Sequence, residues 1–187
     1  PASISAKMTQ ALLLHHRAWF YRGHSYFGAL TAAQRSGYIK YLRLHHKRML
    51  EIAPDVSSDP HWYSQMVSVA KEEGWPDDLF DELIAEAAAR EPYYYGTYFA
   101  AIERNLPQWG GSPAKMREII ERATEYTRDE DGDTFMARGL WQAASYQDDR
   151  FDVASLDLPW EDVDKGFVDI LGKYFSQWNI NAYARFA

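Results

Sequence analysis

Cysteine is absent from all 187 positions of the sequence. Disulfide bonds, thiolate nucleophiles and cysteine-ligated zinc sites are therefore excluded, and this composition is typical of a reducing compartment. Long hydrophobic runs are also missing: ALLL at 11–14 is among the longest, whereas a membrane-spanning helix needs about 20 apolar residues. No signal-peptide pattern opens the sequence. We therefore expect a soluble, cytoplasmic protein with no membrane partner.

Basic residues are in the minority. The 20 Lys and Arg residues against 27 Asp and Glu residues give a net charge of −7, and no run is rich in Lys or Arg. A protein that binds the phosphate backbone needs the opposite sign, so nucleic acid is not an expected partner. An acidic surface instead favours a basic protein partner. Nucleophile elbows, phosphate-binding glycine loops and His-Glu-x-x-His helices are missing too, so we expect no catalytic residues and no cofactor.

Apolar residues recur at three- and four-residue steps along most of the chain, whereas the alternation typical of strands is nearly absent. This pattern predicts an all-α protein of about eight helices. Capping signals predict helix starts near Thr31, Asp59 and Ser112, and we expect Pro54 to end the second helix and Pro92 to open the fifth. The expected single domain spans residues 1–187, with helical hairpins at 3–53, 59–91, 92–127 and 133–179.

Two of these hairpins repeat each other. PHWYSQMVSVAKEEGW and PYYYGTYFAAIERNLPQW align with Pro60 on Pro92, a step of 32 residues, whereas the second helices align Phe80 with Met116, a step of 36. The difference places four additional residues in the corner PQWGGS, where the glycines turn the chain and Trp109 fills the hinge. Hairpins whose apolar faces are too wide for one partner bury them by stacking, as in α-solenoids.

Several segments resemble a known repeat family. MLEIAPD at 49–55 and EAAAREPYY at 86–94 resemble the end of the second helix of a tetratricopeptide repeat. More specifically, YYYGTYFAAIERNLPQWGGS at 93–112, with AWFYRGHSYF at 18–27, resembles an uncharacterised group of bacterial tetratricopeptide-like proteins that carry a Leu-Pro-x-Trp-Gly-Gly-Ser segment. The resemblance is strongest over residues 18–127. It implies a short tetratricopeptide-like α-solenoid with irregular corners, and it implies no catalytic residues.

Two polar patterns are candidate cation sites. The pairs His15-His16 and His45-His46 suggest a transition-metal site between two helices. If the chain reverses around residues 23–31, however, His15 faces position 40 and misses His45 by about five residues, or ~7.5 Å, and no acidic partner is evident nearby. We therefore favour packed neutral histidines and predict no metal site. RDEDGD at 128–133 fails the calcium-loop pattern, because Arg138 would occupy the bidentate position, and we expect a solvated corner there.

The aromatic content is high, with 13 Tyr, 9 Phe and 7 Trp residues. These rings serve either as core spacers between helical layers or as a binding surface. On the second interpretation, the open concave face of the solenoid carries the partner-binding residues, namely Tyr63, Tyr93, Tyr94, Thr97 and Arg104. We predict a non-enzymatic protein- or peptide-binding module, with immunity, antitoxin and scaffold proteins as special cases. The alternative is a small metal-dependent hydrolase with histidine and carboxylate ligands from facing helices.

Overall fold

The computed structural model describes residues 3–187, so positions 1 and 2 of the predicted domain lie outside the described residues. Within this range the chain is helical, and its extended pairing is limited to one bridge between Asp148 and Phe151. The all-α prediction is confirmed, with nine α-helices in this range rather than about eight. They are α1 (Ile4–Arg22), α2 (Ala32–Val56), α3 (Pro60–Glu73), α4 (Asp77–Arg90), α5 (Tyr95–Arg104), α6 (Pro113–Asp131), α7 (Thr134–Ala144), α8 (Trp160–Lys173) and α9 (Gln177–Phe186).

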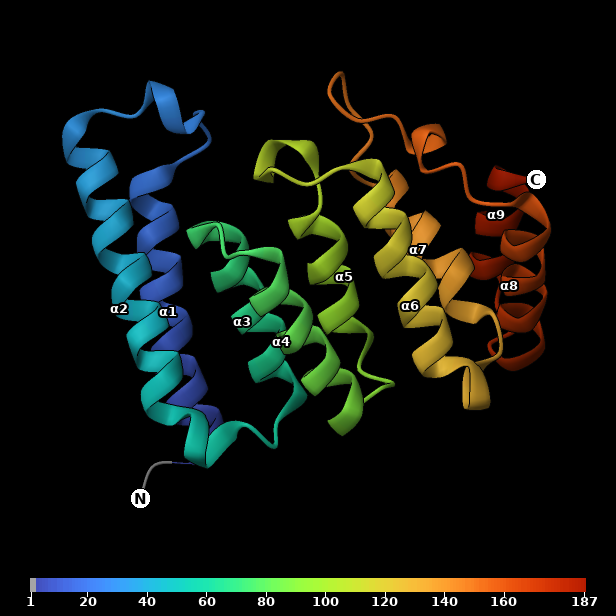
Figure 1. Cartoon of the computed structure of the whole chain (residues 1–187), viewed down its shortest axis with the longest axis horizontal. Helices are drawn as coiled ribbons and strands as arrows, with labels where there is room; N and C mark the ends of the chain where they lie inside the picture. The colour runs from blue at the N-terminus through green and yellow to red at the C-terminus, as the bar shows by residue number, and fades with distance from the viewer. Residues whose placement is uncertain (1–2) are drawn as a thin grey trace.

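The helices form antiparallel hairpins that follow one another along the long axis of the molecule, from α1 and α2 at one end to α8 and α9 at the other (Figure 1). The first helices of successive hairpins pack together, α3 against α5 and α5 against α7. Each hairpin thereby covers the apolar face of its neighbour, which is how a helical-repeat fold builds one continuous core. No helix among residues 3–187 is both long and apolar enough to cross a membrane.

Most helix ends follow the local signals in the sequence. Thr31 forms the predicted capping box with Gln34, and the side chains of Asp59 and Ser112 accept hydrogen bonds from the first turns of α3 and α6. Gly74 ends α3 in the left-handed conformation, with φ of 67°. The side chains of Thr31, Asp59 and Ser112 thus satisfy backbone N–H groups that have no partner within the helix itself.

Three predicted helix boundaries are wrong. Pro54 lies inside α2, which continues to Val56. A proline removes only the hydrogen bond of its own missing N–H group, so the two residues after it remain helical. Pro92 lies in a turn before α5, which begins at Tyr95. The predicted eighth helix is two helices, because α8 ends at Lys173 and Ser176 caps α9 through the N–H group of Asn179.

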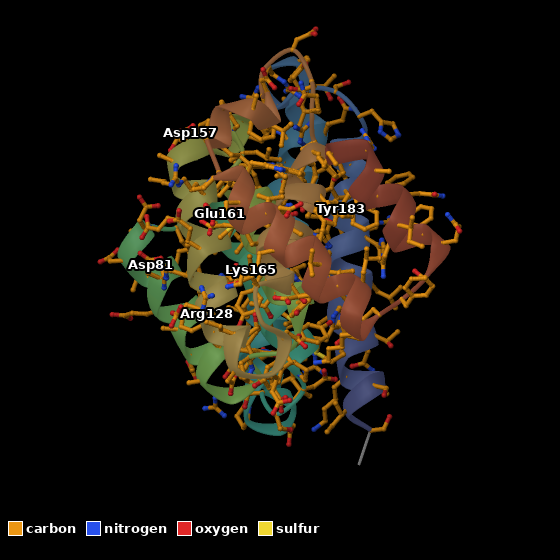
Figure 2. The ribbon with its side chains drawn as sticks, turned by 90° about the vertical axis from the view of Figure 1, so that its right-hand side faces the viewer. Asp81, Arg128, Asp157, Glu161, Lys165 and Tyr183 are labelled. Atoms are coloured by element: carbon orange, nitrogen blue, oxygen red, sulfur yellow. The ribbon has the colours of Figure 1, made fainter. Side chains whose placement is uncertain are left out.

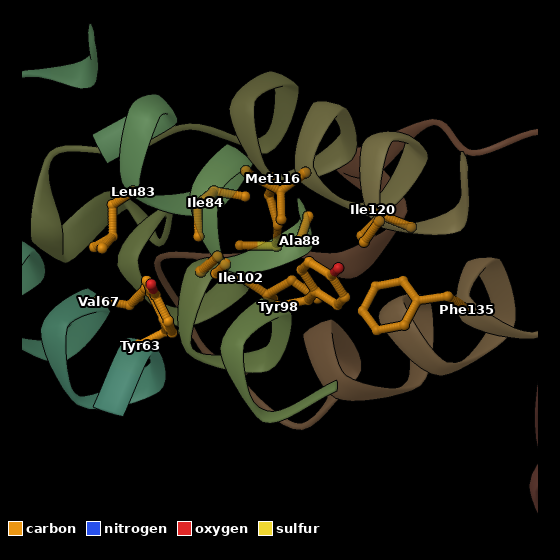
Figure 3. Packing of buried hydrophobic residues seen from close by; sticks show 14 of the residues in the cluster. Tyr63, Val67, Leu83, Ile84, Ala88, Tyr98, Ile102, Met116, Ile120 and Phe135 are labelled. Atoms are coloured by element: carbon orange, nitrogen blue, oxygen red, sulfur yellow. The ribbon is translucent and has the colours of Figure 1, made fainter. Parts of the chain in front are cut away.

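The late start of α5 changes the register of the repeat. Burial now matches at a step of 35 residues in the first helices, where Tyr63 corresponds to Tyr98 and Val67 to Ile102, and these pairs occupy the core in Figure 3. The second helices match at the predicted step of 36. One additional residue therefore distinguishes the two units, not four. The corner itself is a short 3₁₀ turn, Pro107–Trp109, that ends in Gly110 with φ of 82°.

Buried acids hold the end of α6 against α8. Asp133 is 5% exposed and forms ion pairs with Arg128 and Lys165, which lie close together on the face shown in Figure 2. Asp131 is 8% exposed and pairs with Lys173. The prediction that 128–133 forms a solvated corner is therefore wrong for these two carboxylates. The charges are tolerated inside because each has a cationic partner.

Candidate binding groove

The structure scatters the five predicted partner-binding residues. Tyr63, Thr97 and Arg104 are 1%, 3% and 5% exposed, so their predicted placement on an open face is wrong. For Thr97 and Arg104 the cause is the three-residue error in register, since the corrected step makes them equivalent to core positions of α3. Tyr63 belongs to the buried residues of α3 itself. Tyr93 remains exposed and Tyr94 is partly buried.

Arg104 is a structural link between α5 and α4. Its guanidinium donates to the carbonyl oxygen of Trp75 at 2.9 Å and to the carboxylate of Asp77 at 3.0 Å. It also lies 4.8 Å from the centre of the Phe80 ring. These contacts pair the charge of the buried guanidinium, although its Nε, like that of Arg138, is buried without an acceptor. The side chain is only 5% exposed, so a ligand on the surface does not reach it.

Tyr93 and Tyr94, at the start of α5, have separate partners. The hydroxyl group of Tyr93 donates to Asp129 at 2.8 Å, and this hydrogen bond raises the pKa of Tyr93 to about 12. The hydroxyl oxygen of Tyr94 lies 3.2 Å from Nδ1 of His61. Tyr93, 44% exposed, lines a hollow on the surface and Tyr94 does not.

That hollow shares Arg138 with a second hollow, and we call the two together the aromatic groove. The first half has a volume of about 530 Å³, and its lining includes Tyr93, Tyr95, Asp131, Arg138, Lys173 and Tyr174. The second half, of about 230 Å³, is lined by residues that include Phe99, Arg138, Trp141 and Trp178. Arg138 belongs to both halves. The groove therefore follows α5 and α7 and reaches the region where α8 passes into α9.

Aromatic contacts shape the second half of the aromatic groove. Trp141 of α7 and Trp178 of α9 stack with ring centres 5.9 Å apart at 27°, and Trp178 remains 73% exposed. Tyr95 meets Phe99 edge to face at 6.1 Å. Exposed rings held by other rings offer apolar area at a small cost in side-chain entropy, which is why such residues are common in binding surfaces.

Two charges of the first half have no ion-pair partner within residues 3–187, the exposed carboxylate of Glu130 and the guanidinium of Arg138. Burial acts to raise the pKa of Asp131, but hydrogen bonds from Lys173 and Tyr95 outweigh it and lower that pKa. The guanidinium of Arg138 lies 5.4 Å from the centre of the Tyr174 ring. Its Nε is buried without a hydrogen-bond acceptor, and it forms no ion pair within residues 3–187. The groove thus combines aromatic walls with a cationic group that can donate a hydrogen bond to a carbonyl or carboxylate oxygen.

The sequence contains little that singles out these residues. Trp178 has the spacing to continue the apolar stripe of α8, but the chain breaks after Lys173 and Trp178 lies exposed on α9. Arg138 and Trp141 are three residues apart in α7 and so share one helical face. That spacing predicts that the two side chains are neighbours. It indicates a groove only once Phe99 and Trp178 are known to line the same hollow.

The histidine pairs are closer than the sequence predicts. The rings of His15 and His45 lie 5.0 Å apart, and Nε2 of His15 is 2.8 Å from Oε1 of Glu72, an acidic partner that the sequence does not reveal. Side chains tilt toward the N-terminus of their own helix, so on antiparallel helices these two rings tilt toward each other and close the expected gap. Among the described residues, no group of three His, Asp or Glu side chains has the geometry to hold a metal ion.

Comparisons of this chain with family models, curated proteins and solved structures give no match. The resemblance over residues 18–127 therefore stays a prediction.

Proposed function

We propose that this protein is a non-enzymatic helical-repeat module that binds a protein or peptide segment in the aromatic groove. The observation that carries the proposal is Arg138. A partly buried guanidinium without an acceptor is costly, and an oxygen atom from a bound segment removes that cost. Trp141 and Trp178 provide the neighbouring surface on which an apolar part of the segment can lie.

The charge of the whole chain bears on the kind of partner. A net charge of −7 attracts basic proteins and accelerates encounter with them. A basic partner can still supply a backbone carbonyl or a carboxylate to Arg138. A bacterial immunity or antitoxin protein, or a cytoplasmic scaffold, is a setting in which such a module operates, and the tetratricopeptide-like resemblance supports this setting. The metal-dependent hydrolase stays an untested alternative, for which elemental analysis of the purified protein is the direct measurement.

The test is capture of partners from cell extract, followed by mass spectrometry, with matched variants. We expect the double change Arg138→Gln and Trp178→Ala to abolish capture of a partner that the wild type retains, because it removes the free donor and the most exposed ring of the groove. Phe175→Ala is the control, since Phe175 is 77% exposed but lies outside the groove lining.

Phe175→Ala should unfold at nearly the same temperature as the wild type, because substitutions of exposed side chains change stability little. Arg138 is partly buried, so circular dichroism must show that the double variant is folded at the temperature of the capture experiment. Capture that survives in the double variant, or that disappears equally with Phe175→Ala, contradicts binding in the aromatic groove.

A further inference from the structure

A second hollow lies at the other end of the molecule, beside the connection between α1 and α2. It has a volume of about 390 Å³ and is lined by residues that include Phe27, Tyr38, Ile39, Leu42, Glu72 and Glu73. We call it the Glu72 cavity. Phe27 and Tyr38 meet at 59° with ring centres 6.2 Å apart, and with Ile39 and Leu42 they give the cavity apolar walls. Its acidic groups come from α3.

Glu72 is the unusual residue of this cavity. Its side chain is 1% exposed. Oε1 accepts a hydrogen bond from Nε1 of Trp19 at 2.7 Å and lies 2.8 Å from Nε2 of His15. Oε2 is buried and has no hydrogen-bond partner within residues 3–187. Leaving an oxygen of a buried carboxyl group unsatisfied is costly, so this atom is the expected point of attachment for a donor that enters the cavity.

The geometry selects the kind of donor. A guanidinium binds a carboxylate best through two parallel hydrogen bonds, which need both oxygens. Trp19 and His15 already occupy Oε1, so one oxygen remains. An ammonium group is a compact charge that can bind a single oxygen, and its alkyl stem can lie along apolar side chains. Aromatic rings at such a site add cation–π attraction.

We propose that the Glu72 cavity binds a primary alkylammonium group, with Glu72 as its charge partner and Ile39 and Leu42 in contact with its alkyl chain. The lysine side chain of a partner protein is the source that the net charge of −7 favours. This site goes beyond the proposed function, because it is distinct from the aromatic groove and binding at each is measured separately.

Charged neighbours limit the affinity without filling the cavity. Arg43 lies on the rim and is exposed, and its positive charge repels an ammonium ligand. Glu73 is already in contact with His46, whose Nδ1 lies 2.9 Å from the Glu73 carboxylate. Glu73 therefore contributes to the local charge but is not the unsatisfied group, and this makes it the matched control for Glu72.

The experiment titrates the full chain with N-acetyl-lysine methylamide and follows amide chemical shifts by NMR. N-acetyl-norleucine methylamide, which lacks the charge, and the corresponding arginine derivative are titrated in parallel. We expect saturable shifts in α2 and α3 with the lysine compound, at least about tenfold weaker binding for the arginine compound and none for norleucine. The guanidinium finds only one free oxygen for its two parallel hydrogen bonds, and norleucine lacks the charge. Glu72→Gln should weaken binding of the lysine compound by about tenfold or more, and Glu73→Gln by much less.

Ile39→Trp provides an independent check that leaves the carboxyl group in place. The larger ring should fill the cavity and block binding even if Glu72→Gln fails to fold, which circular dichroism reveals. The proposal is overturned if the wild type does not bind the lysine compound at millimolar concentration, if norleucine binds equally well, or if both the folded Glu72→Gln and Ile39→Trp variants retain full binding.

Discussion

His45 combines complete burial with a group that titrates near neutral pH. It is 0% exposed, and its Nδ1 donates to the carbonyl oxygen of Ala11 at 2.9 Å, which fixes the neutral tautomer with the proton on Nδ1. Burial in the first place, and then the charge of His15, lower the pKa of His45 to about 4. The expectation of a packed neutral histidine is therefore confirmed for His45.

This pKa predicts a loss of stability in mild acid. The unfolded chain binds a proton at His45 near pH 6.5, whereas the folded chain does so only near pH 4. Between these values the unfolded state holds more protons, so the free energy of unfolding rises with pH. The contribution of His45 is complete above about pH 6.5 and is lost progressively as the pH falls toward 4.

Urea denaturation at a series of pH values measures this slope. His45→Asn keeps a donor for Ala11 but does not titrate, so its free energy of unfolding should depend less on pH between 6.5 and 4 than that of the wild type. Equal slopes in the two proteins would mean that protonation of His45 is not linked to unfolding.

Single residues also show where sequence reasoning fails. Arg104 is expected on the open face of the solenoid but is buried. The partners of Arg104 are Asp77 and the carbonyl oxygen of Trp75. These contacts come from the preceding hairpin, so no local pattern around position 104 can reveal that the charge is satisfied.

Helices and their caps, in contrast, follow from neighbouring residues. The caps at Thr31, Asp59 and Ser112 depend on hydrogen bonds within a few positions, and the sequence predicts them correctly. The alignment of Pro60 with Pro92 fails because a proline opens α3 but only precedes α5. A proline is compatible with both a first turn and a loop, so only packing distinguishes them.

The approach of α6 to α7 gives a test at the level of elements. A Cβ atom at Gly139 would lie 2.8 and 2.9 Å from two side-chain carbons of Ile120, whereas one at Gly172 in α8 would meet nothing within 4 Å. Alanine favours a helix over glycine by up to about 1 kcal/mol. We expect Gly172→Ala to be stabilising and Gly139→Ala to be destabilising by about 1–3 kcal/mol, because overpacking outweighs propensity there.

Thermal or urea unfolding of the two variants gives the sign directly. Combining Gly139→Ala with Ile120→Ala, which removes both side-chain carbons at the contact, should destabilise by less than the sum of the two single changes. A Gly139→Ala protein as stable as Gly172→Ala would show that α6 and α7 are farther apart, or adjust more readily, than the structure indicates.

At the scale of the whole molecule, the aromatic groove forms only where residues from different hairpins meet. Periodicity predicts that hairpins stack, and this part of the fold is correct. The aromatic groove could not be predicted in the same way, because it requires α9 to turn back so that Trp178 reaches Trp141. A three-residue break at 174–176 decides this, and in the sequence it is masked by apolar residues that continue the stripe of α8.

The core is uneven along the molecule. One cluster of buried residues extends from Met8 to Ala182, but the outer half of the α1–α2 hairpin has its own small cluster of Ala18, Tyr38 and Leu42. In repeat folds each unit is stabilised chiefly by its neighbours, and regions with few buried contacts open locally at a lower free energy than global unfolding. The end of this hairpin should therefore open before the middle of the molecule.

Native-state hydrogen exchange followed by mass spectrometry tests this expectation. Amides around Ala18 and Tyr38 should exchange faster than those of α3, α5 and α6, which lie in the main cluster. Leu42→Ala should increase exchange at the end of the hairpin, with little change in α5 and α6, because the lost packing belongs to the small cluster. Protection that is equal along the chain, or that falls everywhere by the same amount in Leu42→Ala, would mean that the hairpin and the repeats unfold as one cooperative unit. In that case the Glu72 cavity would be held as firmly as the aromatic groove.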